Sequence, residues 1–224
     1  MSMIQRSIRS FVCRKGRLSD SNHDQWTRLW PQYGIESSTL EWEMIFGRQA
    51  PTVLEIGFGN GQSLLEMALN SPEKNFVGIE VYHKGLCRLL AQVEHMSLSN
   101  VRVMCGDAAE LLHRVPLASL STVQIFFPDP WPKKRHHKRR LIQETFVGLV
   151  AKKLEKGGIL HLATDWMDYA YHMMSVLSSS TVLNNLAGEH RFMERPKSRP
   201  ITKYERRGWR LGHSSWDLMF QRID

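Results

Sequence analysis

The chain has 224 residues, enough for one domain with extensions, and 42% of them are hydrophobic, which is typical of a folded globular protein. Its formal net charge of +8 favours an anionic partner, nucleic acid first and an anionic membrane surface second. The sequence contains no apolar run of membrane-spanning length, no signal-peptide core and no Cys-x-x-Cys or His/Cys cluster. These features argue against a membrane protein and a zinc site, and the three scattered cysteines fit the reduced cytoplasm.

The N-terminal 22 residues are interpreted as a basic arm, followed by a single domain over residues 23–224. Residues 1–19 contain five arginines and lysines and no acidic residue. A transit peptide has a similar composition, but the basic character of the whole chain favours an arm. Residues 24–47 are rich in tryptophan and are expected to form one or two short helices that cover an edge of the core.

From Thr52 onward, apolar runs alternate with amphipathic segments. The expected strands are 52–56, 75–81, 100–104, 122–127, 158–164 and 216–222, and the expected helices are 62–69, 85–94 and 141–154. Gly157 and Gly158 are expected to end the last of these helices. This alternation predicts an α/β fold with a mostly parallel sheet and helices on both faces.

Three glycines at alternate positions, Gly57, Gly59 and Gly61, separate the first expected strand from its helix. Glycine allows a tight turn and a close approach of the backbone to a ligand. The G-x-G-x-G spacing differs from the dinucleotide fingerprint, and Glu55 would repel a pyrophosphate but suits an ammonium or sulfonium group. The stretch is similar to motif I of S-adenosylmethionine-dependent methyltransferases. The alternative is a glycine turn without a ligand.

Acidic residues stand at the carboxyl ends of the first five expected strands, where ligands bind in parallel sheets. They are Glu55, Glu80, Asp107, Asp129 and Asp165. An acid at Glu80 can accept both ribose hydroxyls, and Asp107 lies where an adenine amino group would be. Each acid alone could be a helix cap, but five in phase behind a glycine turn favour a ligand site.

Prolines flank Asp129 in the segment 126–132, which favours a preorganised acid over a solvated turn residue. Six of the next eight residues, 133–140, are lysine or arginine. We expect this run just before and within the first turn of helix 141–154, where cations oppose the helix dipole and an RNA phosphate would resolve the conflict. A solvated charged face is the alternative. A second polar cluster, 195–208, is expected to form a substrate lid or an exposed connector.

Taken together, these motifs resemble the bacterial tRNA (guanine-N7)-methyltransferase family over nearly the whole chain. The segments that carry the resemblance are 9–12, 14–17, 54–59, 127–131, 135–140, 202–205 and 210–220. Pro-Asp-Pro-Trp and Thr-Lys-Tyr-Glu are far more specific than the glycine motif. The resemblance implies a Rossmann-like class I methyltransferase fold with a seven-stranded, mostly parallel sheet and a basic N-terminal extension.

The resemblance also implies a reaction: methyl transfer from S-adenosylmethionine to N7 of guanine 46 in the variable loop of tRNA. The products are 7-methylguanosine and S-adenosylhomocysteine. No metal is implied, the partner is tRNA, the location is the cytoplasm, and the protein is a monomer or a homodimer.

The residues implied by the resemblance fall into three groups, with Asp129 as the catalytic residue. Those implied to bind the cofactor are Glu55, Gly57, Gly59, Gly61, Glu80, Asp107 and Asp129. Those implied to bind the target nucleotide are Lys133, Asp165, Thr202, Lys203, Tyr204 and Glu205. Those implied to bind RNA are Lys134, Arg135, His136, His137, Lys138, Arg139 and Arg140.

N7 of guanine has an in-plane lone pair and no proton, so its methylation requires alignment and a negative environment rather than a general base. Asp129 would hold the guanine edge or stabilise the cationic ring, and the sequence leaves both roles open. The first rival is a methyltransferase that acts on protein or a small molecule, against which the basic run argues. The second is a non-enzymatic RNA-binding protein, against which Glu55, Glu80 and Asp107 argue.

Overall fold

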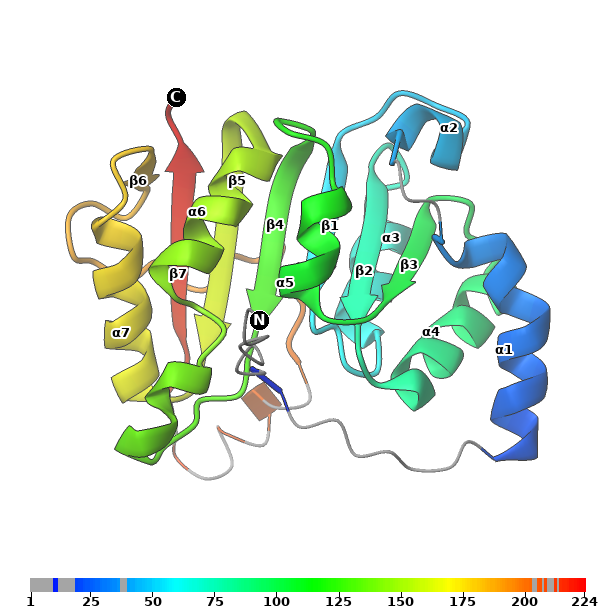
Figure 1. The fold of residues 1–224 in the computed structure, drawn as a ribbon, viewed down its shortest axis with the longest axis horizontal. Coiled ribbons are helices and arrows are strands. Elements are labelled where there is room, and N and C mark those ends of the chain that lie inside the picture. The colour runs from blue at the N-terminus through cyan, green and yellow to red at the C-terminus, as the bar shows by residue number, and fades with distance from the viewer. Residues whose placement is uncertain are drawn as a thin grey trace, which may run out of the picture.

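The computed structural model describes residues 10–11, 19–36, 40–202, 205–206, 208, 212 and 214–224, so the predictions for Lys203 and Tyr204 lie outside the described residues. Seven strands form one sheet in the order β3-β2-β1-β4-β5-β7-β6 (Figure 1). Strands β1 to β5 are parallel, and β7 runs antiparallel between β5 and β6. The predicted seven-stranded, mostly parallel sheet is therefore confirmed. The strands are β1 Thr52–Ile56, β2 Asn75–Glu80, β3 Val101–Cys105, β4 Leu120–Phe126, β5 Leu154–Thr164, β6 Leu183–Asn185 and β7 Trp216–Arg222.

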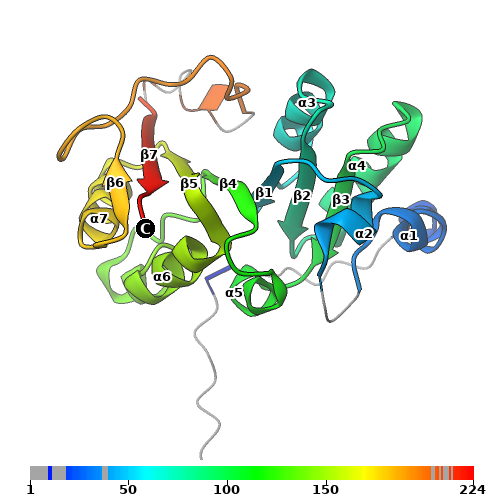
Figure 2. The ribbon, with the colours of Figure 1, turned by 90° about the horizontal axis from the view of Figure 1, so that it is seen from above.

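Helices cover both faces of the sheet, as the alternating pattern predicts (Figure 2). The apolar residues of α1, α3 and α4 form a core on one face, and those of α5, α6 and α7 form a core on the other. The expected one or two helices over residues 24–47 are present as α1 and α2. The helices are α1 Asp20–Tyr33, α2 Trp42–Phe46, α3 Gln62–Asn70, α4 His83–His95, α5 Ala108–Leu111, α6 Glu144–Lys153 and α7 Met167–Ser178, with 3-10 turns η1 Leu112–Arg114 and η2 Lys134–Arg139.

Helix α6 ends earlier than expected, and the two glycines near its end have a different role. Leu154 is fully buried and pairs with Leu120 of β4, so the chain enters the sheet directly after Lys153. The register between β4 and β5 then shifts, and Gly157 lies in this irregular part of β5 with φ = +83°. The glycines therefore serve a bulge rather than a helix terminus.

The basic run does not lie in the first turn of α6. The prediction that its charges oppose the dipole of that helix is therefore wrong. Residues 134–139 form their own 3-10 turn, η2, and α6 begins at Glu144. The start is displaced because α7 holds the chain extended at Ile142, whose N–H donates to the Tyr169 hydroxyl (3.1 Å) and whose carbonyl contacts His172 Nε2 (2.8 Å). Any preference of this run for phosphate must come from its charge and exposure.

Helix α7 and strand β6 lie where no element was expected. Helix α7 buries Tyr169, Met173 and Leu177, which recur at the four-residue spacing of an amphipathic helix, so its sequence carried a usable signal. Strand β6 has only three residues, too few for a detectable alternation. Within the described part of the chain, no helix combines the length and apolar character needed to cross a membrane.

Candidate active site

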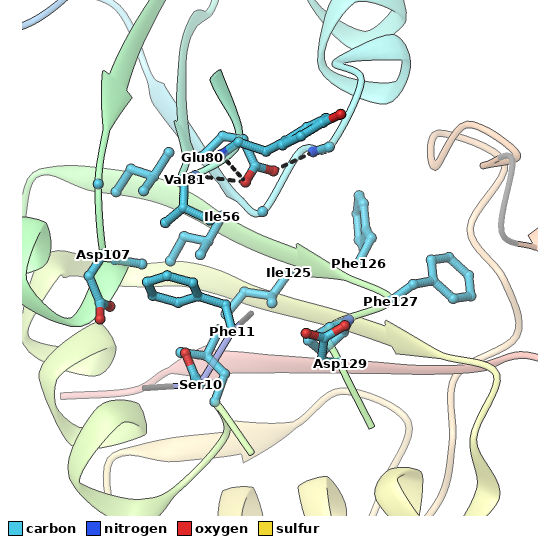
Figure 3. Close-up of a pocket in the computed structure, with 18 residues that line it drawn as sticks. Ser10, Phe11, Ile56, Glu80, Val81, Asp107, Ile125, Phe126, Phe127 and Asp129 are labelled. Carbon is cyan, nitrogen blue, oxygen red and sulfur yellow. Dashed lines mark hydrogen bonds between the residues drawn. The ribbon is translucent and has the colours of Figure 1, made fainter. Parts of the chain in front are cut away.

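A cavity of about 500 Å³ opens at the carboxyl ends of the parallel strands. Its walls come from the ends of β1, β2 and β4, at the point where the strand order reverses between β1 and β4. Ligands bind at such switch points in open α/β sheets. Glu80, Asp107 and Asp129 all line this cavity, so the structure brings three of the five predicted acids together (Figure 3).

The glycine turn forms one wall of this cavity. Its backbone adopts conformations that residues other than glycine rarely adopt. Gly57, Gly59 and Gly61 have φ values of +75°, +59° and +77°. A side chain at Gly57 or Gly59 would meet open space, so backbone conformation rather than crowding selects glycine at these two positions. The Gly57 N–H donates to the carbonyl of Ile79 (2.8 Å), which fixes the turn against the end of β2.

Glu80 joins the end of β2 to this turn. Its Oε2 accepts the Gly59 N–H (2.8 Å), and its Oε1 accepts the N–H groups of Val81 (2.7 Å) and Tyr82 (3.0 Å). Burial raises the pKa of Glu80, although the three backbone donors lower it. A carboxylate oxygen accepts up to two hydrogen bonds, so Oε2 keeps acceptor capacity toward the cavity.

Asp107 is both a helix cap and part of the cavity wall. Its Oδ1 accepts the Ala109 N–H (3.0 Å), which caps α5. Its place in the cavity leaves its second oxygen available to a ligand (Figure 3). The cap interpretation and the ligand interpretation of this acid are therefore compatible.

Asp129 stands in a strained loop. Phe127 and Trp131, two residues to either side, have φ values of +53° and +46°, which are uncommon for residues other than glycine. Such strain costs on the order of 1–3 kcal/mol per residue and is often found at functional sites. Asp129 is exposed at the cavity mouth, yet desolvation by the cavity walls raises its pKa, while the nearby Arg139 lowers it.

Several contacts hold this loop in place. The Phe127 N–H donates to the Ala163 carbonyl of β5 (2.8 Å). The Trp131 indole N–H donates to the carbonyl of Ser10 (2.9 Å), and the Arg139 guanidinium lies 3.9 Å from the centre of the Trp131 ring. Ser10 and its neighbour Phe11 thereby reach the cavity, which they also line. Sequence analysis named segment 9–12 only as part of the resemblance and interpreted it as a basic arm, so it missed this contribution to the cavity wall.

Glu55 faces a second cavity, of about 470 Å³, on the α3 side of the sheet. Side chains alternate along a strand, and its neighbour Ile56 lines the first cavity, so Glu55 points the opposite way. Glu55 is 3% exposed, and its Oε2 has no hydrogen-bond partner among the described residues. Burial, and then the charge of Glu80, raise its pKa to about 8. The two cavities share Gly57, Phe126 and Phe127 as walls.

The basic run divides into outward-facing and inward-facing residues. Lys133, Lys134, Arg135 and Lys138 are exposed, and His136 and His137 are partly buried. Burial and the surrounding lysines and arginines lower the pKa of His136. Arg140 is 3% exposed and its guanidinium binds protein atoms, so its burial argues against the predicted role in RNA binding, which stays a prediction.

Four of the residues predicted to bind the target nucleotide are described by the structure, and they do not all lie at one cavity. Thr202 lines the second cavity, and Lys133 is exposed at the start of η2. Asp165 follows β5 at the same edge of the sheet but, within the described part of the chain, lines neither cavity. Glu205 is 1% exposed, and its carboxylate oxygens accept from Arg199 Nη1 (2.8 Å) and Nη2 (2.7 Å).

Arg199, which sequence analysis missed, is the centre of a buried polar network. Its guanidinium also binds the carboxylate of Asp217 in β7 (2.7 and 3.0 Å), and Asp217 in turn contacts His161 of β5 (2.8 Å). Burial works against the charge of Arg199, but its bonds to Glu205 and Asp217 outweigh burial and raise its pKa. Its sequence signals were its place in the polar cluster 195–208 and Asp217, an acid in an otherwise apolar strand that the structure buries.

Comparison with solved structures defines the fold. A structure described as an antibiotic-related methyltransferase superposes with a TM-score of 0.58 at 16% identity, covering 85% of this chain and 97% of that chain. An rRNA methylase from Streptococcus thermophilus superposes with a TM-score of 0.54 at 13% identity, covering 95% of this chain and 100% of that one. The fold is therefore that of the Rossmann-like methyltransferases, as expected.

Sequence comparison defines the family. A family model described as "Putative methyltransferase" matches residues 49–218. The tRNA (guanine-N(7)-)-methyltransferase of Alcanivorax borkumensis is 51% identical over 222 residues, covering 98% of this chain and 93% of the relative. That of Escherichia coli K12 is 51% identical over 221 residues, covering 97% and 92%. The chain belongs to the bacterial tRNA (guanine-N7)-methyltransferase family, which confirms the resemblance.

Proposed function

We propose that this enzyme transfers a methyl group from S-adenosylmethionine to N7 of guanine 46 in the variable loop of tRNA. The observation that carries the proposal is the combination of an acid-lined cavity and a basic run at one edge of the sheet. Glu80, Asp107 and Asp129 surround a cavity there, and the exposed residues of the basic run follow directly after the loop that holds Asp129. A small-molecule methyltransferase has no need of such a run, and an RNA-binding protein without activity has no need of the acid-lined cavity.

The residues around the first cavity fit the cofactor by their chemistry. Glu80 and Asp107 each offer a carboxylate oxygen to hydroxyl or amino donors, as the ribose and adenine groups require. The glycine turn of Gly57, Gly59 and Gly61 allows close approach of the backbone. Glu55 is buried, and its Oε2 has no hydrogen-bond partner among the described residues, so it suits the ammonium end of the cofactor. To reach Glu55 in the second cavity, that end would have to extend past the wall that the two cavities share. When bound, S-adenosylmethionine supplies a methyl group activated by its sulfonium charge.

Asp129 would align the guanine or stabilise the positive charge that develops on its ring. N7 carries no proton, so Asp129 has none to remove, and its preorganised loop places a negative charge without further rearrangement. Lys133, Asp165, Thr202, Lys203 and Tyr204 are proposed to contact the target nucleotide. For Glu205 we propose an indirect role, because its carboxylate is occupied by Arg199, which anchors the loop that carries Thr202.

Exposed residues of the basic run are proposed to bind tRNA phosphates. These are Lys134, Arg135, His136, His137 and Lys138, with Arg139 divided between phosphate and the Trp131 ring. Residues 1–22 are proposed as a basic arm on a single methyltransferase domain. The proposed location is the cytoplasm, and the oligomeric state is a monomer or a homodimer.

The decisive experiment uses a tRNA in which the target guanine is replaced by 7-deazaguanine. This base keeps the Watson–Crick edge but has carbon at the attacking position, so it should bind with nearly normal affinity and remain unmethylated. Unmodified tRNA is the positive control for the same enzyme preparation. Efficient methylation of the 7-deazaguanine tRNA would mean that the reactive atom is not N7.

Substitution of Asp129 separates its charge from its shape. Asp129→Ala should lower kcat by about 100-fold or more, because the aligned negative charge is lost, while tRNA affinity changes little. Asp129→Asn keeps the shape and one acceptor but not the charge, so its kcat indicates which property matters. A normal kcat in both variants would remove Asp129 from the reaction.

A further inference from the structure

Arg140 differs from the other residues of the basic run by its burial. It is 3% exposed, whereas Lys134, Arg135 and Lys138 are exposed. It stands at the end of η2, where the chain turns inward toward Leu141, a residue of the first cavity wall. A buried arginine cannot release counterions from a phosphate backbone unless it leaves its own contacts.

Protein atoms already bind two of the three nitrogens of this guanidinium, Nε and Nη2. The Arg140 Nε–H donates to the carbonyl of Pro130 (3.0 Å), and Nη2 lies 3.2 Å from His137 Nε2 and bonds to the carboxylate of Asp168. The guanidinium also lies 4.8 Å from the centre of the Tyr169 ring. Asp168 and Tyr169 belong to α7, so Arg140 connects the loop after β4 to this helix.

Pro130 directly follows Asp129, so a bond that fixes the Pro130 carbonyl also restricts the position of Asp129. Proline has no N–H, so this carbonyl is the only backbone polar group of Pro130 that a side chain can hold. The loop has non-glycine residues with positive φ at Phe127 and Trp131, and such conformations persist only where the surroundings fix them. The Arg140 bond holds the residue next to Asp129, between these two strained positions.

We propose that Arg140 is a positioning residue: it holds the Pro130 carbonyl, braced by Asp168, and thereby aims the Asp129 carboxylate into the cavity. The basic run then has two separate roles, with its exposed residues on the RNA and Arg140 on the active-site loop. This inference rests on the proposed function of Asp129 in methyl transfer.

The contact between Arg140 and Asp168 can be tested by substitution, because the Asp168 carboxylate is accessible to water. The Asp168 side chain is 62% exposed, so removal of Arg140 does not leave a buried unpaired charge. Arg140→Lys keeps the charge but loses the planar fork that reaches Pro130 and Asp168 together. Asp168→Asn keeps an oxygen that can accept from Arg140 but removes the opposite charge beside a guanidinium that is 1% exposed, so it weakens the contact at some cost in stability, which thermal unfolding measures.

The test measures kcat at saturating tRNA together with the tRNA dissociation constant and its salt dependence. Arg140→Lys should lower kcat by about 10- to 100-fold, because a small displacement of an aligned group has that effect. The tRNA dissociation constant and its salt slope should stay near the wild-type values. Asp168→Asn should lower kcat by a smaller factor in the same direction.

A double-substitution cycle shows whether Arg140 acts through Asp129. In an Asp129→Asn background, Arg140→Lys should cause little further loss of kcat, because the group that it positions is already impaired. A general loss of structure would instead lower kcat by the same factor in both backgrounds. Arg28→Lys is the matched control, since Arg28 pairs with Glu94 on the exposed surface of α1 and α4, and its kcat and tRNA affinity should be unchanged.

Three results would overturn the proposal. The first is a normal kcat in both Arg140→Lys and Asp168→Asn. The second is the same fractional loss in both backgrounds. The third is weaker tRNA binding with a salt slope reduced by about one unit, which would identify Arg140 as a phosphate ligand. If Arg140→Lys does not fold, Asp168→Asn and its cycle with Asp129→Asn decide. Methylation of unmodified tRNA by the wild-type enzyme tests the proposed function separately.

Discussion

At the scale of single residues, Glu55 is the most strongly perturbed acid of the candidate site. Its carboxyl group is almost completely buried, close to a second acid, and one of its oxygens has no partner in the described part of the chain. Burial of a charge without a partner is costly, so the folded protein favours the protonated form. An ammonium group bound beside it would supply the missing partner.

This arrangement predicts a pH-dependent stability. Burial raises the pKa of Glu55 from 4.5 to about 8 in the folded state, so between these values the folded protein keeps a proton that the unfolded chain releases. Stability contributed by this group is complete below pH 4.5 and is lost as the pH rises to about 8. Glu55→Gln should therefore stabilise the protein above pH 8, by about 1 kcal/mol or more, relative to wild type.

Thermal unfolding without cofactor, measured across this pH range, checks the prediction. Glu66→Gln, on an exposed acid that lines the same cavity, controls for the loss of a glutamate as such. The difference between Glu55→Gln and wild type should grow with pH. A difference that stays constant from acid to alkaline pH would contradict the raised pKa.

At the scale of elements, the glycine turn depends on a close contact with α4. A side chain added at Gly85 would lie 2.0 Å from the Gly59 carbonyl oxygen, and backbone cannot rotate away as a side chain can. Gly59 in turn donates its N–H to Glu80. The glycine on α4 therefore supports the candidate cofactor site, since it packs against Gly59 and donates its N–H to the carbonyl of Tyr82 (2.9 Å), and both residues line the first cavity.

We predict that Gly85→Ala weakens binding of S-adenosylmethionine and lowers stability by about 1–3 kcal/mol, because the added methyl group overlaps the turn. Isothermal calorimetry and thermal unfolding measure the two effects. Gly148→Ala in α6 is the matched control: its added atom meets nothing within 4 Å, so it should gain about 0.5–1 kcal/mol and leave cofactor affinity unaltered. Equal cofactor affinity in both variants would refute the contact.

The elements also show where sequence patterns are sufficient. The strands β1 and β7 begin and end at the expected residues, because each apolar run is bounded by polar or turn residues. The start of α6 was wrong by three residues because Tyr169 and His172, nearly thirty positions away, hold Ile142 extended. Likewise, topology predicted the acids at the strand ends. The burial of Arg140 could not be predicted in the same way, because it depends on contacts with Asp168 and Tyr169, nearly thirty positions away.

At the scale of the whole molecule, the distribution of charge matters more than its sum of +8. Exposed lysines and arginines of the basic run follow the carboxyl end of β4, beside the cavity. Other exposed lysines, such as Lys152 and Lys156, lie where β5 begins, at the opposite edge of the same parallel pair. If net charge alone attracted tRNA, the two groups would contribute equally to binding.

The last prediction compares two variants that lose the same charge at opposite edges of the sheet. Neutralising Lys134 and Lys138 to glutamine should weaken tRNA binding and reduce the slope of log affinity against log salt by about 1.5 to 2 units, because two phosphate contacts no longer release counterions. Neutralising Lys152 and Lys156 should leave that slope nearly unchanged. Filter binding across a salt series measures both. Because the binding site for tRNA is local in this proposal, equal slopes in the two variants would show that the basic run is only a solvated face and that long-range attraction carries the affinity.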